Sequence, residues 1–142
     1  MTLTLETART IIDKALAEGE EHGFKPLTVV VLDAGGHVTA AARQDGASNN
    51  RFEIAQGKAY GALALGMGSR SIMERAEQQA YFIAAATAAL GGRLIPVPGG
   101  VLVRDSDGAV VGAVGISGDS SDNDEAAAAA AITAAGLTAQ VD

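Results

Sequence analysis

The feature that most constrains the fold is a turn pattern that occurs twice, each time after a valine-rich segment. Asp33-Ala34-Gly35-Gly36-His37-Val38 and Asp105-Ser106-Asp107-Gly108-Ala109-Val110 share the spacing D-x-x-G-x-V. An aspartate side chain can accept bonds from its own turn, and glycine adopts positive φ without a steric cost. The pattern therefore predicts two β-hairpins, one over about 27–44 and one over about 100–117.

Helices are expected before, between and after the hairpins. Helical spacing of apolar residues, glycine stops and cap residues place them at 3–22, 48–66, about 69–90 and about 122–135. Hairpins imply an antiparallel sheet, and the helices must cover it. The chain of 142 residues thus predicts a single α+β domain, a sandwich of two or three layers spanning residues 1–142.

The net charge and the amino-acid composition exclude several classes of binding partner and of functional site. The formal net charge of −7 argues against nucleic acid or an anionic membrane surface, because both attract cationic proteins. The absence of cysteine excludes disulfides, thiolate chemistry and cysteine-based metal sites. The first residues lack the pattern of a signal peptide, and no apolar run is long enough to span a bilayer, so we expect a cytoplasmic location.

A group of acidic residues lies where the second hairpin meets an alanine-rich helix. Ser121 and Asp124 fit a capping box, and Asp122 and Glu125 repeat the pattern one residue later. Carboxylates in the first turn also interact favourably with the helix dipole, and each stabilises the helix by about 0.3–1 kcal/mol. A calcium loop is the alternative, but the EF-hand glycine and distal glutamate are missing. We therefore predict helix capping and no metal site.

The segment before these acidic residues is rich in small residues. Gly112, Ala113, Gly115, Ser117 and Gly118 leave room for something to lie flat on the strand. The alanine helix, a partner subunit and a ligand are three candidates. Between Arg43 and Arg93 basic residues outnumber acidic ones, which indicates either solvated helix faces or a site for a small anion.

Several motifs together resemble one known family. VVVLDAGGHVTAAARQDGA, QGKAYGALA and VPGGVLVRDSDGAVVGAVGISGDSSDNDEAAAAAA occur in the order and spacing of the GlcG/HbpS family, and the match spans almost the whole chain. This family of haem-binding or haem-degrading domains includes the C-terminal domain of PduO-type proteins. The resemblance implies a profilin-like or PAS-like fold with an antiparallel sheet of about five strands. It also implies dimer-based homo-oligomers such as tetramers or octamers, and a link to haem or to catabolic enzymes.

Haem is the cofactor that the resemblance implies. An axial ligand would come from His22 or His37, and Arg51, Lys58 or Arg70 would pair with the propionates. His22 lies near the end of the first helix, and His37 follows a turn and is expected to be exposed. Tyr81 is expected in the core.

A cofactor-independent enzyme or binder of a small carboxylate is the alternative. Its pocket would lie over the glycine-rich strand and the loop with Gly99 and Gly100. Arg43 or Arg75 would clamp the carboxylate, since a guanidinium binds it through two parallel bonds. Lys58 or Asp124 would act as acid or base, although an exposed helix lysine is the simpler interpretation of Lys58.

A third hypothesis is an assembly subunit in which the alanine and glycine surfaces make oligomer contacts. Whether the chain is an enzyme stays open on the residues alone.

Overall fold

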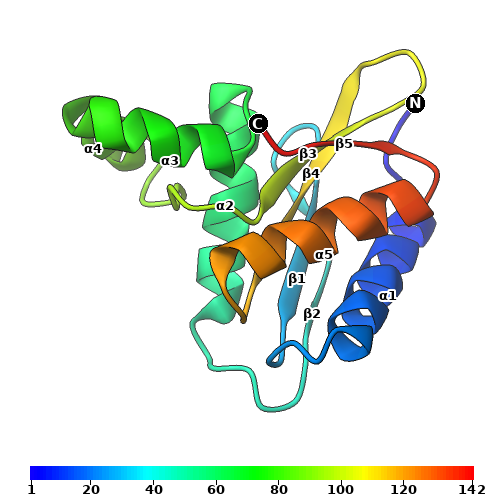
Figure 1. The fold of residues 1–142 in the computed structure, drawn as a ribbon. Coiled ribbons are helices and arrows are strands. Elements are labelled where there is room, and N and C mark those ends of the chain that lie inside the picture. The colour runs from blue at the N-terminus through cyan, green and yellow to red at the C-terminus, as the bar shows by residue number, and fades with distance from the viewer.

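The computed structural model describes residues 1–142, and the chain forms five helices around a five-stranded sheet (Figure 1). The elements follow in the order α1 (Leu5–Glu21), β1 (Thr28–Asp33), β2 (Val38–Arg43), α2 (Arg51–Leu65), α3 (Ser69–Gln78), α4 (Ala80–Ala89), β3 (Gly100–Arg104), β4 (Val110–Ser117), α5 (Ser121–Ala134) and β5 (Thr138–Gln140). The predicted α+β class is confirmed.

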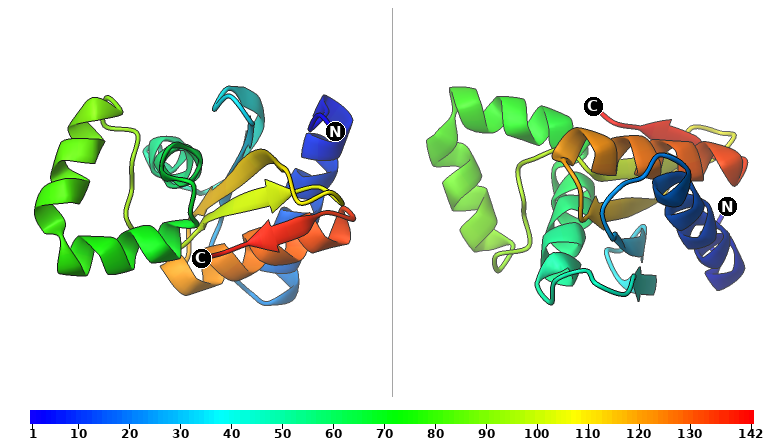
Figure 2. Two further views of the ribbon diagram at one scale, coloured as in Figure 1. Left: turned by 90° about the horizontal axis from the view of Figure 1, so that it is seen from above. Right: turned by 60° about the horizontal axis from the view of Figure 1, so that its bottom comes forward.

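The sheet is antiparallel throughout and has the strand order β2-β1-β4-β3-β5. Both predicted hairpins are present, as β1–β2 and β3–β4. They join through β1 and β4, so that Thr28 lies opposite Ser117 and Asp33 opposite Gly112. Seen from above, β2 and β5 form opposite edges of the sheet (Figure 2).

Helices cover both faces of the sheet (Figures 1 and 2). On one face α1 and α5 pack on alternate strand residues such as Val29, Val31 and Ile116. On the other face α2 packs its alanines on Val30, Leu32 and Leu102. This alternation is the period-two pattern of a sheet buried on both sides. α3 and α4 project from α2 and enclose a small apolar cluster of their own.

The two D-x-x-G-x-V turns have the same hydrogen bonds. Asp33 Oδ1 accepts from the backbone N–H of Gly35 and of His37, each at 2.9 Å. Asp105 Oδ1 accepts from the N–H of Asp107 and of Ala109, each at 3.0 Å. The glycines Gly36 and Gly108 have φ of 84° and 82°, where any Cβ would be strained. The repeated sequence therefore encodes one turn used twice.

The segment expected as one helix over about 69–90 is two helices. The chain breaks at Gln79, with φ −139° and ψ 63°, which closes α3 and opens α4. Arg75 stabilises the corner, because its Nε donates to Gln79 Oε1 at 2.7 Å and its guanidinium lies 4.1 Å from the centre of the Phe82 ring. Tyr81, expected in the core, is 73% exposed on the projecting α4. Ile83, two residues later, fills the inner position instead.

Close backbone contact explains two glycines. A Cβ on Gly115 of β4 would lie 1.9 Å from the carbonyl oxygen of Ala55 in α2. A Cβ on Gly100 of β3 would lie 2.2 Å from the carbonyl oxygen of Lys58. The backbone of α2 thus lies directly on the sheet, and a side chain at Gly100 or Gly115 would push the helix away from the strands. The alanine helix, a partner subunit and a ligand were the candidates for covering the small residues of this strand. A helix of the same chain covers them, but that helix is α2 and not the alanine-rich α5. No helix is both long and apolar enough to cross a membrane.

Candidate functional site

Lys58 of α2 and Asp124 of α5 form a buried ion pair. Lys58 Nζ donates to Asp124 Oδ2 at 3.1 Å and to the carbonyl oxygen of Ile116 at 2.9 Å. Both side chains are 2% exposed. Asp124 Oδ1 in turn accepts from the backbone N–H of Asp119 at 2.9 Å. Lys58 is therefore not the exposed helix lysine that the sequence favoured, and Asp124 does not cap α5.

The loop before β3 makes room for this pair. A Cβ on Gly99 would lie 2.8 Å from Lys58 Nζ, and Gly99 has φ of 125°. Ser69, the first residue of α3, holds the next residue in place by accepting from the N–H of Gly100 at 2.7 Å. The N-cap of α3 is Gly68. Gly99 and Gly100 thus pack on the lysine, and neither lines a cavity.

Burial shifts both ionisable groups toward their neutral forms. Removal from water lowers the pKa of Lys58, and the Asp124 carboxylate acts in the opposite direction. Removal from water likewise raises the pKa of Asp124, and the Lys58 ammonium opposes that rise. Since neither residue lines a cavity of the structure, the pair connects α2 to α5 and has no visible path to a substrate.

The acids at the start of α5 have separate partners. Ser120, one residue before the predicted cap, accepts from the N–H of Asn123 at 3.1 Å. Asp119 accepts from the N–H of Lys25 and of Ser120 and from the Asn123 amide, and these bonds lower its pKa to about 2. Hence Asp119 anchors the loop before β1 to the start of α5.

Arg70 of α3 binds the remaining acids of this helix. Its guanidinium donates to the carboxylates of Asp122 and Glu125, at 3.0 Å for the bond from Nε to Glu125 Oε2. Arg70 therefore joins α3 to α5, and its charge is already paired with two carboxylates.

Arg51, the first residue of α2, lies at a small cavity. Its Nη1 donates to Ser117 Oγ at 3.1 Å. The cavity has a volume of 220 Å³, and its lining includes Lys25, Pro26, Ser48 and Gly118. Two cationic residues thus border one hollow.

A larger open groove adjoins it across Pro26. Its volume is 510 Å³, and its lining combines the end of α1 with the loop after β2: Leu16, Gly19, Glu20, Phe24, Pro26, Arg43, Gln44 and Asp45. Arg43 donates from Nη1 to the carbonyl oxygen of Ala47 at 2.8 Å, which turns its guanidinium across this loop. The groove therefore has apolar wall residues and a cation.

His22 stands beside this groove. It caps the C-terminus of α1, and the neighbouring residues Glu20 and Phe24 both line the groove. The imidazole is 51% exposed and stacks on the Phe24 ring, with 5.7 Å between the centroids and 28° between the planes. Its Nε2 lies 2.8 Å from Glu18 Oε1.

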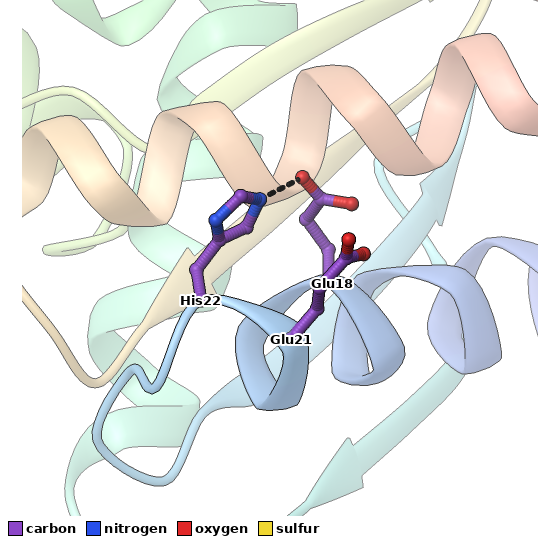
Figure 3. A group of neighbouring side chains, drawn as sticks. All are labelled: Glu18, Glu21 and His22. Carbon is purple, nitrogen blue, oxygen red and sulfur yellow. Dashed lines mark hydrogen bonds and ion pairs between the residues drawn. The ribbon is translucent and has the colours of Figure 1, made fainter.

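Figure 3 shows that Glu18, Glu21 and His22 point to the same side of the α1 terminus. One ligand atom from each lies within 4.8 Å of the others, and Glu21 and His22 are exposed. We assign no metal to the group, since exposed acids on one helix turn gather in this way without one.

The structure thus distributes the sequence-based candidates over three places. Lys58, Asp124, Gly99 and Gly100 meet in the interior, and Arg70 binds the outside of α5. His22, Arg43 and Arg51 lie around the two adjoining hollows. His37, predicted to be exposed, is 82% exposed in the β1–β2 turn, where Nδ1 lies 3.3 Å from Asp33 Oδ1.

Two residues of the groove wall were not singled out from the sequence. Phe24 stacks on His22, and Pro26 borders both hollows. In a chain with 4% aromatic residues, a phenylalanine two positions after a histidine at a helix end is the signal that would have indicated them.

Comparison with known proteins gives a consistent result. The family model described as "Haem degrading protein HbpS-like" matches residues 3–133, which confirms the resemblance drawn from the sequence motifs. No curated protein sequence matches the chain.

Solved structures show the same fold. The chain is similar to a PduOC:haem complex, with 25% identity, a TM-score of 0.86 and coverage of 96% of this chain and 97% of that one. It is similar to the ORFY protein of Klebsiella pneumoniae, with 25% identity, a TM-score of 0.85 and coverage of 96% and 92%. The HbpS structure has 28% identity, a TM-score of 0.80 and coverage of 94% and 90%.

Proposed function

The chain belongs to the HbpS-like family of haem-degrading proteins, and on that premise we propose that it binds haem at the 510 Å³ groove, with His22 as the axial ligand. The single observation that carries the proposal is the half-exposed His22 imidazole stacked on Phe24 at the rim of this groove. The PduOC structure, which is a haem complex, supports haem as the ligand class.

The groove residues fit the chemistry of the group. Haem iron takes a histidine nitrogen as axial ligand, and the macrocycle needs an apolar wall. Here Phe24, Pro26 and Leu16 supply apolar surface, and Arg43 supplies a cation for a propionate. Arg51 and Lys25, across Pro26, are two further cations at this end of the molecule. Bound haem would supply an iron centre, and these side chains would bind and orient it.

Two basic residues proposed from the sequence are already engaged elsewhere. Lys58 is buried on Asp124, and Arg70 is paired with Asp122 and Glu125. We therefore assign propionate contacts to Arg43 and Arg51, and place Lys58 and Arg70 in the framework. Gly99 and Gly100 belong to that framework too, since they pack on Lys58. The alternative ligand His37 is less suited, because it is 82% exposed on the β1–β2 turn and stacks on no aromatic ring, whereas His22 stacks on Phe24 of the groove wall.

Haemin titration of the purified protein tests the proposal. We expect a saturable Soret shift near one haem per chain. His22→Ala should weaken binding by about tenfold or more, which corresponds to about 1.4 kcal/mol per factor of ten. His37→Ala is the matched control and should bind as the unmodified protein does. An unsaturable response, or equal titrations of the two histidine variants, would contradict the proposal.

A second candidate is a small carboxylate ligand in the 220 Å³ cavity. The observation that favours it is Arg51, which uses one guanidinium nitrogen on Ser117 and lies with Lys25 at this cavity. Thermal stabilisation by a series of small carboxylates, lost in Arg51→Gln and kept in Arg104→Gln, would support this function. The same screen with no stabilisation at saturating ligand would exclude it.

A further inference from the structure

The chain contains the dipeptide Asp-Gly twice, at Asp45–Gly46 and at Asp107–Gly108. In this dipeptide the glycine nitrogen can attack the aspartyl carboxyl carbon, because glycine has no Cβ to obstruct the approach and its backbone adopts many conformations. All four residues are exposed, so exposure does not distinguish the two dipeptides. Their hydrogen bonds do.

The peptide unit between Asp45 and Gly46 makes no hydrogen bond. The carbonyl oxygen of Asp45 has no donor, and the N–H of Gly46 has no acceptor. The Asp45 carboxylate makes no hydrogen bond or ion pair either. A Cβ on Gly46 would meet only Pro26, at 3.4 Å, so neighbouring atoms leave this unit room to rotate. Rotation can therefore bring the Gly46 nitrogen onto the carboxyl carbon of Asp45.

The corresponding unit in the β3–β4 turn is held in place. The N–H of Gly108 donates to the carbonyl oxygen of Asp105 at 3.0 Å. The N–H of Asp107 donates to Asp105 Oδ1, also at 3.0 Å. Attack by the Gly108 nitrogen on Asp107 therefore requires the turn to open first.

The Asp45–Gly46 unit lies where the two hollows of this end of the molecule meet. Asp45 lines the 510 Å³ groove, and Gly46 lines the 220 Å³ cavity. Arg43 spans the same segment, because its Nη1 donates to the carbonyl oxygen of Ala47 at 2.8 Å. A change in the main chain at Asp45 therefore alters the walls of both hollows and the position of the Arg43 guanidinium.

We propose that Asp45–Gly46 is a site of spontaneous isoaspartate formation. The Gly46 nitrogen bonds to the carboxyl carbon of Asp45, and the carboxyl oxygen leaves as water with the amide proton, which gives a five-membered succinimide. Water then opens this ring at either carbonyl, so that one product is aspartate again and the other is isoaspartate. Isoaspartate adds one CH₂ to the main chain between Arg43 and Ala47 and leaves a free α-carboxylate on the groove wall. Water is the only co-reactant, and the reaction does not depend on haem binding.

Ageing of the folded chain at neutral pH, below its unfolding temperature, tests the proposal. Isoaspartyl methyltransferase with labelled S-adenosylmethionine marks isoaspartate, and trypsin separates the two sites into the peptides 44–51 and 105–142. We expect unchanged-mass label to accumulate in 44–51 about tenfold or more faster than at Asp107, because the turn that holds Asp107 has to open first. Deamidation of Asn49 or Asn50 is recognised by its change in mass. In urea the two Asp-Gly sites should react at similar rates, since the turn is lost.

A matched pair of variants assigns the label to its residue. Asp45→Glu keeps the charge but should remove the label from 44–51, because attack on a glutamyl carboxyl carbon needs a six-membered ring that closes far more slowly. Asp107→Glu is the control and should leave the labelling of 44–51 unchanged. Equal rates at the two sites in the folded chain, no label in 44–51 while the urea-treated chain is labelled, or label that persists in Asp45→Glu would each overturn the proposal.

Discussion

Lys58 and Asp124 meet at 3.1 Å in the interior although they belong to helices on opposite faces of the sheet. Lys58 reaches past the end of β4, where it also bonds to the Ile116 carbonyl. The pair is thus a direct connection between the two helical layers, made at the place where Gly99 leaves room for the ammonium.

Replacing only one residue of the Lys58–Asp124 pair should strongly destabilise the protein. Lys58→Met leaves a buried carboxylate without its cation, and Asp124→Asn leaves a buried ammonium without its anion. Each should lower the free energy of unfolding by about 3–5 kcal/mol. The double variant Lys58→Met/Asp124→Leu should be much closer to the unmodified protein than the two single costs added. Urea denaturation measures all four proteins, and additive single costs would contradict the buried-pair account.

Gly115→Ala should destabilise through steric overlap. The new Cβ meets the Ala55 carbonyl oxygen at 1.9 Å, so α2 has to move off the sheet, at a cost of about 1–3 kcal/mol or more. Gly66→Ala is the control: its site is open but its φ is 70°, and the left-handed backbone costs about 1–2 kcal/mol. Near-ultraviolet circular dichroism should change for Gly115→Ala and stay constant for Gly66→Ala.

Asp119 should produce part of the acid sensitivity. Its pKa is lowered from 3.8 to about 2 in the folded protein by the N–H groups of Lys25 and Ser120 and the Asn123 amide. A depressed carboxyl pKa stabilises the fold above pH 3.8, and this contribution disappears as the pH falls toward 2. The melting temperature of Asp119→Asn should therefore lie below that of the unmodified protein at pH 6, and the gap should close toward pH 2.5. A constant gap would contradict this assignment.

Tyr81 and Ile83 should respond in opposite ways to truncation. Tyr81→Ala removes a side chain that is 73% exposed and should change the free energy of unfolding by no more than about 0.5 kcal/mol. Ile83→Ala empties a position that is 5% exposed and should cost about 2–5 kcal/mol. Thermal unfolding of the two variants separates these cases, and a similar cost for both would refute the placement of α4.

The hairpins were predictable because their determinants are local. Asp33 and Asp105 bond to backbone groups within four residues, and the glycine in each turn supplies the positive φ. The N-cap of α1 is equally local, since Thr4 Oγ1 accepts from the N–H of Thr7 three residues later. The N-cap of α5 is Ser120 and not the predicted Ser121, because two adjacent serines satisfy the local capping rule equally well.

The site was less predictable because distant segments create it. Lys58 lies among alanines and glycines that signal neither exposure nor burial, and only the arrival of α5 and the Gly99 loop encloses it. The same holds for the groove beside His22, since its two walls are separated by β1 and β2 in the chain. Tyr81 was misplaced because the break at Gln79, which carries no proline or glycine signal, rotates α4.

The strand order also determines when each strand can find its neighbour during translation. β4 lies between β1 and β3, so the first hairpin has no neighbour on its β1 side until residue 117 has left the ribosome. Lys58 likewise waits for Asp124, which is encoded 66 codons later. In the nascent chain the backbone edge of β1 that faces β4 therefore has no hydrogen-bond partner until β4 has been made. The contacts of β4 with β1 and of Asp124 with Lys58 therefore form only after the segments that they hold together have been made.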